Sequence, residues 1–169
     1  GTVDAVLRRS AARYPDRLAL TFADRQWTYA ELDTAVDRVA VLLGRRGLEP
    51  GARIAAYGVN SDAYLIAFLA ASRAGLTHVP VNYALTGSEL DYLLTDSGAA
   101  LVLVDPAQAS TLQAELDTLP GVESLALQPA AGESADGTLL GAALDGEAGA
   151  VQSPAGGADL AQLLYTSGT

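Results

Sequence analysis

Apolar and polar residues alternate along this chain with two different periods, and the two kinds of segment follow one another in turn. Apolar residues return every three or four positions, as one face of a helix requires, in residues 3–14, 28–47, about 61–74, 86–98 and 107–120. Short apolar or alternating runs, which are typical of strands, occupy residues 18–22, 26–28, 52–58, 76–82, 100–105 and 122–127. We expect a turn at Asp24 and Arg25 between the first two strands.

Helix stop signals support this division. Pro15 closes the first helix, Gly44 or Gly47 the second, and Gly75 the third. Helices that alternate with buried strands at short spacing form βαβ units, which join into a largely parallel sheet. The predicted fold class is therefore α/β, with a parallel-rich sheet, six-stranded if all the runs join it, flanked by helices.

The composition changes after residue 127. Residues 128–159 are rich in Gly, Ala, Ser and Pro, and "TLLGAAL" is the helical pattern among them, so we expect a flexible connection here. The apolar run at residues 160–165 then returns to the sheet. The expected organisation is an α/β subdomain at 1–127, the connection at 128–159, and a strand with the start of a loop at 160–169.

Charge and composition narrow the function classes. The 169 residues carry a formal net charge of −10, and every basic residue is an arginine. Non-specific nucleic-acid binding needs a basic face, so nucleic acid is not an expected partner. The chain has no Cys for disulfides or thiolate metal sites and no apolar run long enough to span a bilayer, and we expect no signal peptide. These features fit a cytoplasmic location.

Two stretches of the form Thr-x-x-Glu predict helix starts. In "TYAE" the Thr28 hydroxyl can accept from the Glu31 N–H while the Glu31 carboxylate accepts from the Thr28 N–H, which is a capping box. Thr86 and Glu89 in "TGSE" have the same spacing. We interpret both stretches as structural.

His78 is the one histidine, and it stands in an apolar strand without an orienting partner nearby in the sequence. A general base needs such a partner, so we expect a packed, hydrogen-bonded His78 and leave it out of the site. No residue is assigned a catalytic or metal-binding role.

The stretch "YTSGT" at the end of the sequence is the candidate binding loop. Thr166, Ser167 and Thr169 bring three hydroxyl groups, and Gly168 allows backbone N–H groups to approach a phosphate closely. A loop at the carboxyl end of a parallel strand is where α/β proteins bind ligands. The alternative is a turn without function, because hydroxyl-rich turns after strands are common.

Three stretches, taken together, resemble the adenylate-forming superfamily. "WTYAEL", "FLAASRAGLTHVPVN" and "LAQLLYTSGT" occur in the order and at about the spacing of the first three core motifs of these enzymes. The superfamily contains acyl-CoA synthetases, adenylation domains of nonribosomal peptide synthetases, and luciferases. The resemblance identifies the chain as the N-terminal part of the large domain of such an enzyme. The break inside the third motif fits proteolysis or deliberate truncation of an exposed loop.

The resemblance implies a site and a reaction. Thr166, Ser167, Gly168 and Thr169 would surround the β- and γ-phosphates of ATP, with Mg²⁺ and coenzyme A as further cofactors of the intact enzyme. The catalytic Lys, the ribose-binding carboxylate and the residues that select the acid would lie beyond residue 169. The 169 residues alone are therefore expected to be inactive. They are also expected to expose apolar surface, which favours a dimer or binding to the remainder of the same chain.

Asn82 bears on the subtype. Acyl-CoA synthetases resemble this sequence at "VPVNYALTGSEL", whereas peptide-synthetase adenylation domains more often have Asp where Asn82 stands. The expected function is activation of a fatty or other carboxylic acid as acyl-adenylate and its transfer to coenzyme A. The alternatives are a peptide-synthetase adenylation domain and a non-catalytic α/β interaction module.

Overall fold

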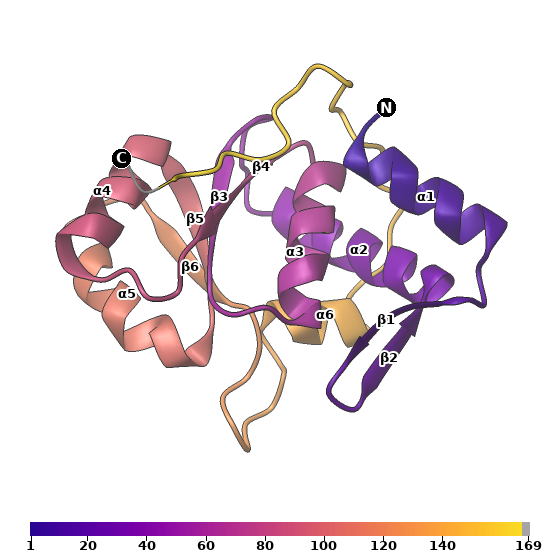
Figure 1. Ribbon diagram of the computed structural model, residues 1–169, viewed down its shortest axis with the longest axis horizontal. Coiled ribbons are helices and arrows are strands. Elements are labelled where there is room, and N and C mark those ends of the chain that lie inside the picture. The colour runs from indigo at the N-terminus through magenta and orange to yellow at the C-terminus, as the bar shows by residue number, and fades with distance from the viewer. Residues whose placement is uncertain (167–169) are drawn as a thin grey trace.

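The computed structural model describes residues 1–166 (Figure 1). The α-helices within this range are α1 (Val3–Arg13), α2 (Tyr29–Gly44), α3 (Asp62–Arg73), α4 (Gly87–Ser97), α5 (Ala109–Leu116) and α6 (Leu139–Asp145). The strands are β1 (Leu18–Phe22), β2 (Arg25–Thr28), β3 (Arg53–Tyr57), β4 (Thr77–Val81), β5 (Ala99–Val104) and β6 (Glu123–Ala126). A short 3-10 helix, η1 (Pro106–Gln108), precedes α5.

The sheet is parallel, as the alternation of helices and strands predicts. Its strand order is β4-β3-β5-β6, and Ile54 of β3 lies opposite His78 of β4 and Leu101 of β5. The six predicted strands do not form one sheet, however. β1 and β2 pair with each other as an antiparallel hairpin apart from the sheet, because their short connection suits antiparallel pairing and not a crossover.

Helices cover both faces of the parallel sheet, with α1, α2, α3 and α6 on one side and α4 and α5 on the other (Figure 1). Successive residues of β3 point to opposite faces: Ile54 packs with Ile66 of α3, whereas Ala55 packs in the cluster that contains Leu90 of α4 and Leu112 of α5. Strands buried on both faces need continuous apolar sequence, which explains why these runs do not alternate with polar residues.

The turn between β1 and β2 falls one residue earlier than the sequence predicts. Ala23 and Asp24 form it, with Ala23 at φ 52°, and Arg25 already belongs to β2. The guanidinium of Arg25 reaches the carboxylate of Asp62 at the start of α3, with Nε 2.6 Å from Oδ2 and NH2 2.8 Å from Oδ1. This pairing joins β2 to the start of α3.

The two predicted capping boxes differ in outcome. At the start of α2 the Glu31 N–H donates to the Thr28 hydroxyl at 3.2 Å, and the Thr28 N–H donates to the Glu31 carboxylate at 2.8 Å, so this box is confirmed. The box at Thr86 is wrong: Thr86 is the N-cap of α4, but its side chain makes no capping hydrogen bond. Gly87, at φ 55°, directly follows the cap, and this backbone departs from a helical first turn.

Parts of residues 128–159 pack against the rest of the molecule. Leu139, Leu140 and Ala143 of α6 belong to the core shared with α2 and α3. Further along, the Ser153 hydroxyl donates to the carbonyl of Ser72 at 3.0 Å. The flexibility of this connection and the unit boundaries at 127 and 159 stay predictions.

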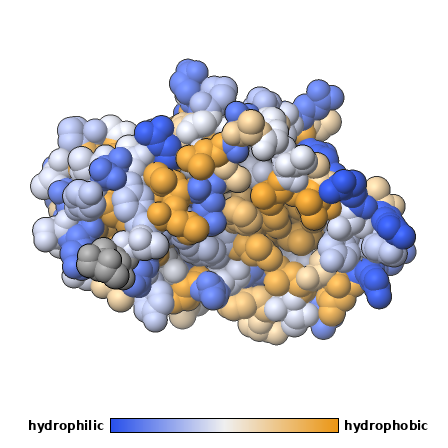
Figure 2. All heavy atoms as spheres, turned by 45° about the horizontal axis from the view of Figure 1, so that its top comes forward, coloured by the Kyte–Doolittle hydropathy of each residue, from blue (hydrophilic) through white to orange (hydrophobic). Residues whose placement is uncertain are grey.

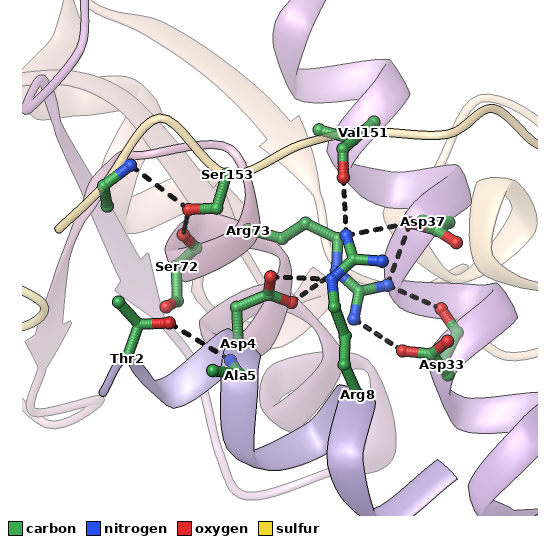
Figure 3. A network of polar contacts seen from close by, with 11 residues as sticks. Thr2, Asp4, Ala5, Arg8, Asp33, Asp37, Ser72, Arg73, Val151 and Ser153 are labelled. Carbon is green, nitrogen blue, oxygen red and sulfur yellow. Dashed lines mark hydrogen bonds and ion pairs between the residues drawn. The ribbon is translucent and has the colours of Figure 1, made fainter. Parts of the chain in front are cut away.

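A buried arginine joins three helices (Figure 3). Arg73, the last residue of α3, is fully buried and contacts Asp4 of α1 and Asp33 and Asp37 of α2 at 2.6, 2.5 and 2.9 Å. Burial alone would lower the pKa of Arg73, but the hydrogen bonds to Asp33 and Asp4 outweigh it and raise that pKa. A planar guanidinium with five N–H groups can serve all three carboxylates at once.

Candidate functional site

The first motif, residues 27–32, joins β2 to α2 and is built into the core. Trp27 is buried, and its indole N–H donates to Asp62 at 3.0 Å. Burial alone would raise the pKa of Asp62, but the hydrogen bonds from Arg25 and Trp27 outweigh it and hold that pKa below its usual value. The motif is therefore a structural element, as the capping pattern indicates.

The second motif, residues 68–82, carries the chain from α3 through Gly75 into β4. Gly75 has φ 72°, and a Cβ there would lie 2.4 Å from Cγ of Pro154, so both the backbone and the available space require glycine. Asn82 follows β4, and its side-chain oxygen accepts from the Ala84 N–H at 3.0 Å. An Asp carboxylate would accept the same bond. The turn therefore does not distinguish the two residues.

The third motif, residues 160–169, is described as far as Thr166. The expected strand at 160–165 is reduced to a single parallel bridge, which pairs Gln162 with His78 at the outer edge of β4. Backbone hydrogen bonds of 3.1 and 2.9 Å flank the bridge. Thr166 is exposed, and Ser167, Gly168 and Thr169 lie outside the described residues.

Tyr165 holds the last described part of this motif. Its hydroxyl donates to Asp96 at 2.7 Å, and this bond raises the pKa of Tyr165 to about 12 because it favours the neutral phenol. Asp96 lies in the last turn of α4, directly before β5, so the phenol lies at the amino-terminal edge of the sheet. Ligands of parallel sheets bind beyond the opposite edge. The phosphate-binding role of Thr166 therefore stays a prediction.

A cavity of about 630 Å³ adjoins Tyr165 at this amino-terminal edge. Its lining carries both signs of charge, from Arg53 on one hand and from Asp96 and Asp159 on the other. Arg53 is also engaged, because its Nε donates to the carbonyl of Ser97 at 2.6 Å. A lining of mixed charge does not attract a polyanion such as a nucleotide.

Asp105 is buried at the opposite, carboxyl-terminal edge of the sheet, at the point where the winding of the sheet reverses. The reversal lies between β3 and β5, since β4 flanks β3 on its other side, and open parallel sheets commonly bind ligands at such a point. Here Asp105 accepts from the Val59 N–H at 2.8 Å and from the Gln128 side chain at 3.1 Å. A Cβ on Gly58 would come within 2.4 Å of this carboxylate. Asp105 is not among the residues predicted from the sequence; a lone acidic residue directly after a buried strand is the signal for it.

His78 is packed and hydrogen-bonded, as predicted. It is 1% exposed, and its ring lies edge-on against Tyr64 and Phe68 of α3. Burial lowers its pKa to about 4, so the ring is neutral near pH 7. Its Nδ1 lies 3.1 Å from the side-chain nitrogen of Gln162.

Apolar side chains gather in the middle of the face shown in Figure 2. Among the described residues, Val6, Leu65, Leu160 and Leu164 are exposed apolar side chains on α1, α3 and the third motif. None of the helices in residues 1–166 is both long and apolar enough to cross a membrane. Exposed apolar patches on a protein surface mark sites of interaction.

Sequence comparison finds relatives along the whole chain. The family profile described as AMP-binding enzyme matches residues 7–169. One of the plipastatin synthase subunits of Bacillus subtilis is 32% identical over 174 residues, which cover 99% of this chain and 6% of that protein. A feruloyl-CoA synthase of an Amycolatopsis species is 40% identical over 106 residues, which cover 63% of this chain and 22% of that protein.

Structural comparison agrees. The N-terminal domain of FACL13 from Mycobacterium tuberculosis matches with a TM-score of 0.86 at 24% identity, covering 99% of this chain and 42% of that one, which establishes the fold. ATP-bound MatB from Rhodopseudomonas palustris matches with a TM-score of 0.81 at 32% identity, covering 99% of this chain and 32% of that one. The chain thus spans less than half the length of each of these relatives.

Proposed function

Because the chain belongs to the AMP-binding family of adenylate-forming enzymes, we propose that the protein activates a carboxylic acid with ATP and transfers the acyl group to coenzyme A. The observation that carries this proposal is the match of the family profile to residues 7–169, which contain the three motifs in order. A non-catalytic interaction module with the same motifs is the competing hypothesis, and it predicts no turnover by the intact protein.

The proposed reaction has two steps. A carboxylate oxygen attacks the α-phosphorus of ATP, so that the mixed-anhydride bond of the acyl-adenylate forms and the bond to pyrophosphate breaks. The sulfur of coenzyme A then attacks the acyl carbon, so that a thioester forms and AMP leaves, while the thiol proton passes to solvent. The first step needs positive charge around the phosphates.

The contribution of this chain to the first step is phosphate binding by the loop at its end. Thr166, Ser167 and Thr169 would donate hydroxyl hydrogen bonds to the β- and γ-phosphates, and Gly168 would let the backbone approach them. Residues 1–166 contain no group of three or more acidic or His side chains that could hold a metal ion. We therefore assign no step to a metal held by this part of the chain, and Mg²⁺ would come with the ATP phosphates.

The choice of coenzyme A as acceptor is supported by the 40% identity to feruloyl-CoA synthase and by Asn82. The second candidate acceptor is the thiol of a carrier protein. It is favoured by the match to plipastatin synthase, which covers 99% of this chain where the feruloyl-CoA synthase match covers 63%. A fatty acid is one member of the class of acids that we propose.

A competition experiment on the intact protein tests the acceptor. The protein is incubated with ATP, Mg²⁺ and a panel of aliphatic, aromatic and amino acids, once with coenzyme A and once with a phosphopantetheinylated carrier protein, and thioesters are detected by mass spectrometry. We expect acyl-CoA from at least one acid and no loaded carrier. Loading of the carrier without acyl-CoA formation would replace this proposal with the second candidate.

A further inference from the structure

Gln162 is joined to β4 by its side chain as well as by the backbone around it. The His78 N–H donates to the carbonyl of Ala161 at 3.1 Å, and the Leu163 N–H donates to the carbonyl of His78 at 2.9 Å. The side-chain nitrogen of Gln162 also lies 3.1 Å from Nδ1 of His78. Any residue other than proline at position 78 supplies both backbone bonds, but the side-chain bond requires an acceptor where the imidazole has Nδ1. The side-chain contact is therefore the residue-specific part of this bridge.

The imidazole of His78 is immobilised from its other side. Tyr64 and Phe68 of α3 lie with their ring centroids 5.6 and 5.2 Å from that of His78, in edge-on arrangements. Because Nδ1 accepts from the amide of Gln162, the proton of the neutral ring is on Nε2, and Nε2 has no hydrogen-bond partner within residues 1–166. A buried N–H without a partner is destabilising. Packing alone would therefore favour an apolar residue, and the bond to Gln162 is what the imidazole adds.

Gln162 has room to turn away if this bond is lost. A cavity of about 280 Å³ lies beside the pair, between the first half of α3 and residues 78 and 162. Gln162 lines it and is only half-buried. The contact with His78 therefore selects one orientation among several that the space permits.

The register of this segment determines where the candidate loop begins. The bridge at Gln162 is the point where the third motif pairs with the sheet in the described residues, and the segment runs past β4 toward α4 (Figure 1). An extended chain advances about 3.3 Å per residue, so a slip of one residue at the bridge would displace Thr166 by that distance. It would also turn alternate side chains to the other face.

We propose that His78 is a positioning residue, which fixes through Gln162 the register of the segment leading into the phosphate-binding loop. This inference rests on the proposed function, because that function makes ATP the ligand of the loop. It assigns His78 no contact with ATP and no proton transfer.

The test uses the intact protein and four variants. Gln162→Met and His78→Leu each remove one partner of the bond, and the double variant removes both. His78→Asn keeps the acceptor, because the Asn side-chain oxygen is as many bonds from Cβ as Nδ1 is. The readouts are KM and kcat for ATP in carboxylate-dependent pyrophosphate exchange, KM for the carboxylate, and the melting temperature.

We expect Gln162→Met and His78→Leu each to raise KM for ATP about tenfold while KM for the carboxylate changes less than about twofold. The double variant should resemble the singles, because all three lack the same bond, and His78→Asn should stay within about threefold of wild type. A folded Gln162→Met variant with unchanged KM for ATP would overturn the inference, as would an asparagine variant as impaired as the leucine variant. A wild-type protein that exchanges no pyrophosphate would overturn the proposed function itself, which separates the two failures.

Discussion

Nε of Arg73 lies 2.6 Å from Oδ1 of Asp4, across 69 residues of the chain. The contact holds α1 against the end of α3, and the same guanidinium reaches α2 through Asp33 and Asp37. Figure 3 shows Arg8 beside this cluster, where it also contacts Asp4 and the carbonyl of Val151. The cluster therefore links the three helices to the segment that precedes the third motif.

The first prediction concerns this buried cation. Arg73→Met leaves three carboxylates without their shared partner, so we expect the free energy of unfolding to fall by about 3–5 kcal/mol. Arg45→Met is the control, because Arg45 pairs with Glu147 on the surface and its loss should cost less than about 1 kcal/mol. Urea unfolding of the two variants measures the difference, and equal losses would contradict the structural role of Arg73.

The second prediction concerns Gly58 and Asp105, at the point where the winding of the sheet reverses. Gly58→Ala places a Cβ within 2.4 Å of the Asp105 carboxylate, which then gives up its bond from the Val59 N–H. We expect a loss of about 2–3 kcal/mol in the free energy of unfolding. In contrast, a Cβ added to Gly44 would meet no atom within 4 Å, so Gly44→Ala should be neutral or stabilising by up to about 1 kcal/mol. If both alanine variants unfold at the same urea concentration, the close approach of Gly58 to the Asp105 carboxylate is contradicted.

The third prediction concerns the free energy of unfolding at acidic pH. Burial lowers the pKa of His78 from 6.5 to about 4, so between these values the unfolded chain binds a proton that the folded chain does not. The free energy of unfolding should therefore fall as the pH drops through this window, by roughly 3 kcal/mol from this residue. His78→Asn removes the titrating group. The stability difference between wild type and this variant should shrink toward pH 4, and a difference that is constant from pH 7 to pH 4 would show that His78 titrates normally.

The sequence predicts elements whose cause is local. The capping box of Thr28 and Glu31 lies within one turn of helix, and each parallel strand is a short, continuous apolar run that the sequence shows directly. The box at Thr86 fails although it has the same Thr-x-x-Glu spacing, because Gly87 at φ 55° gives the first turn a backbone that does not bring the hydroxyl to a capping bond. The motif alone therefore predicts where a helix starts but not which side chain caps it.

Features with distant causes could not be predicted in this way. Arg25 pairs with Asp62, which is 37 residues away, and the Arg73 cluster needs two other helices. Asp105 acquires its role from Gly58 and Gln128 across the sheet edge. For the candidate site, the sequence shows the hydroxyl groups and the glycine of the loop, and the resemblance to the family implies that they bind phosphate. Of the four predicted loop residues, Thr166 is the one that lies within the described part.

The fourth prediction concerns the loop and uses the intact protein. Thr169→Val and Thr166→Val each delete a hydroxyl and keep the shape, and Ser167→Ala deletes the third. If each hydroxyl binds a phosphate oxygen, its loss should lower kcat/KM for ATP roughly 10- to 150-fold with little change in melting temperature. Thr95→Val, at an exposed position on α4, is the matched control and should leave kcat/KM unchanged. Loop variants that melt lower yet turn over at the wild-type rate would make "YTSGT" a turn without a binding role.

The most direct test of adenylate formation is carboxylate-dependent exchange of labelled pyrophosphate into ATP. The intact protein and the 169-residue chain are assayed side by side with the panel of carboxylic acids, without any thiol acceptor. We expect exchange by the intact protein with at least one acid, none without an acid, and none by the 169-residue chain. A folded intact protein that catalyses no exchange with any acid in the panel would contradict the proposed activity.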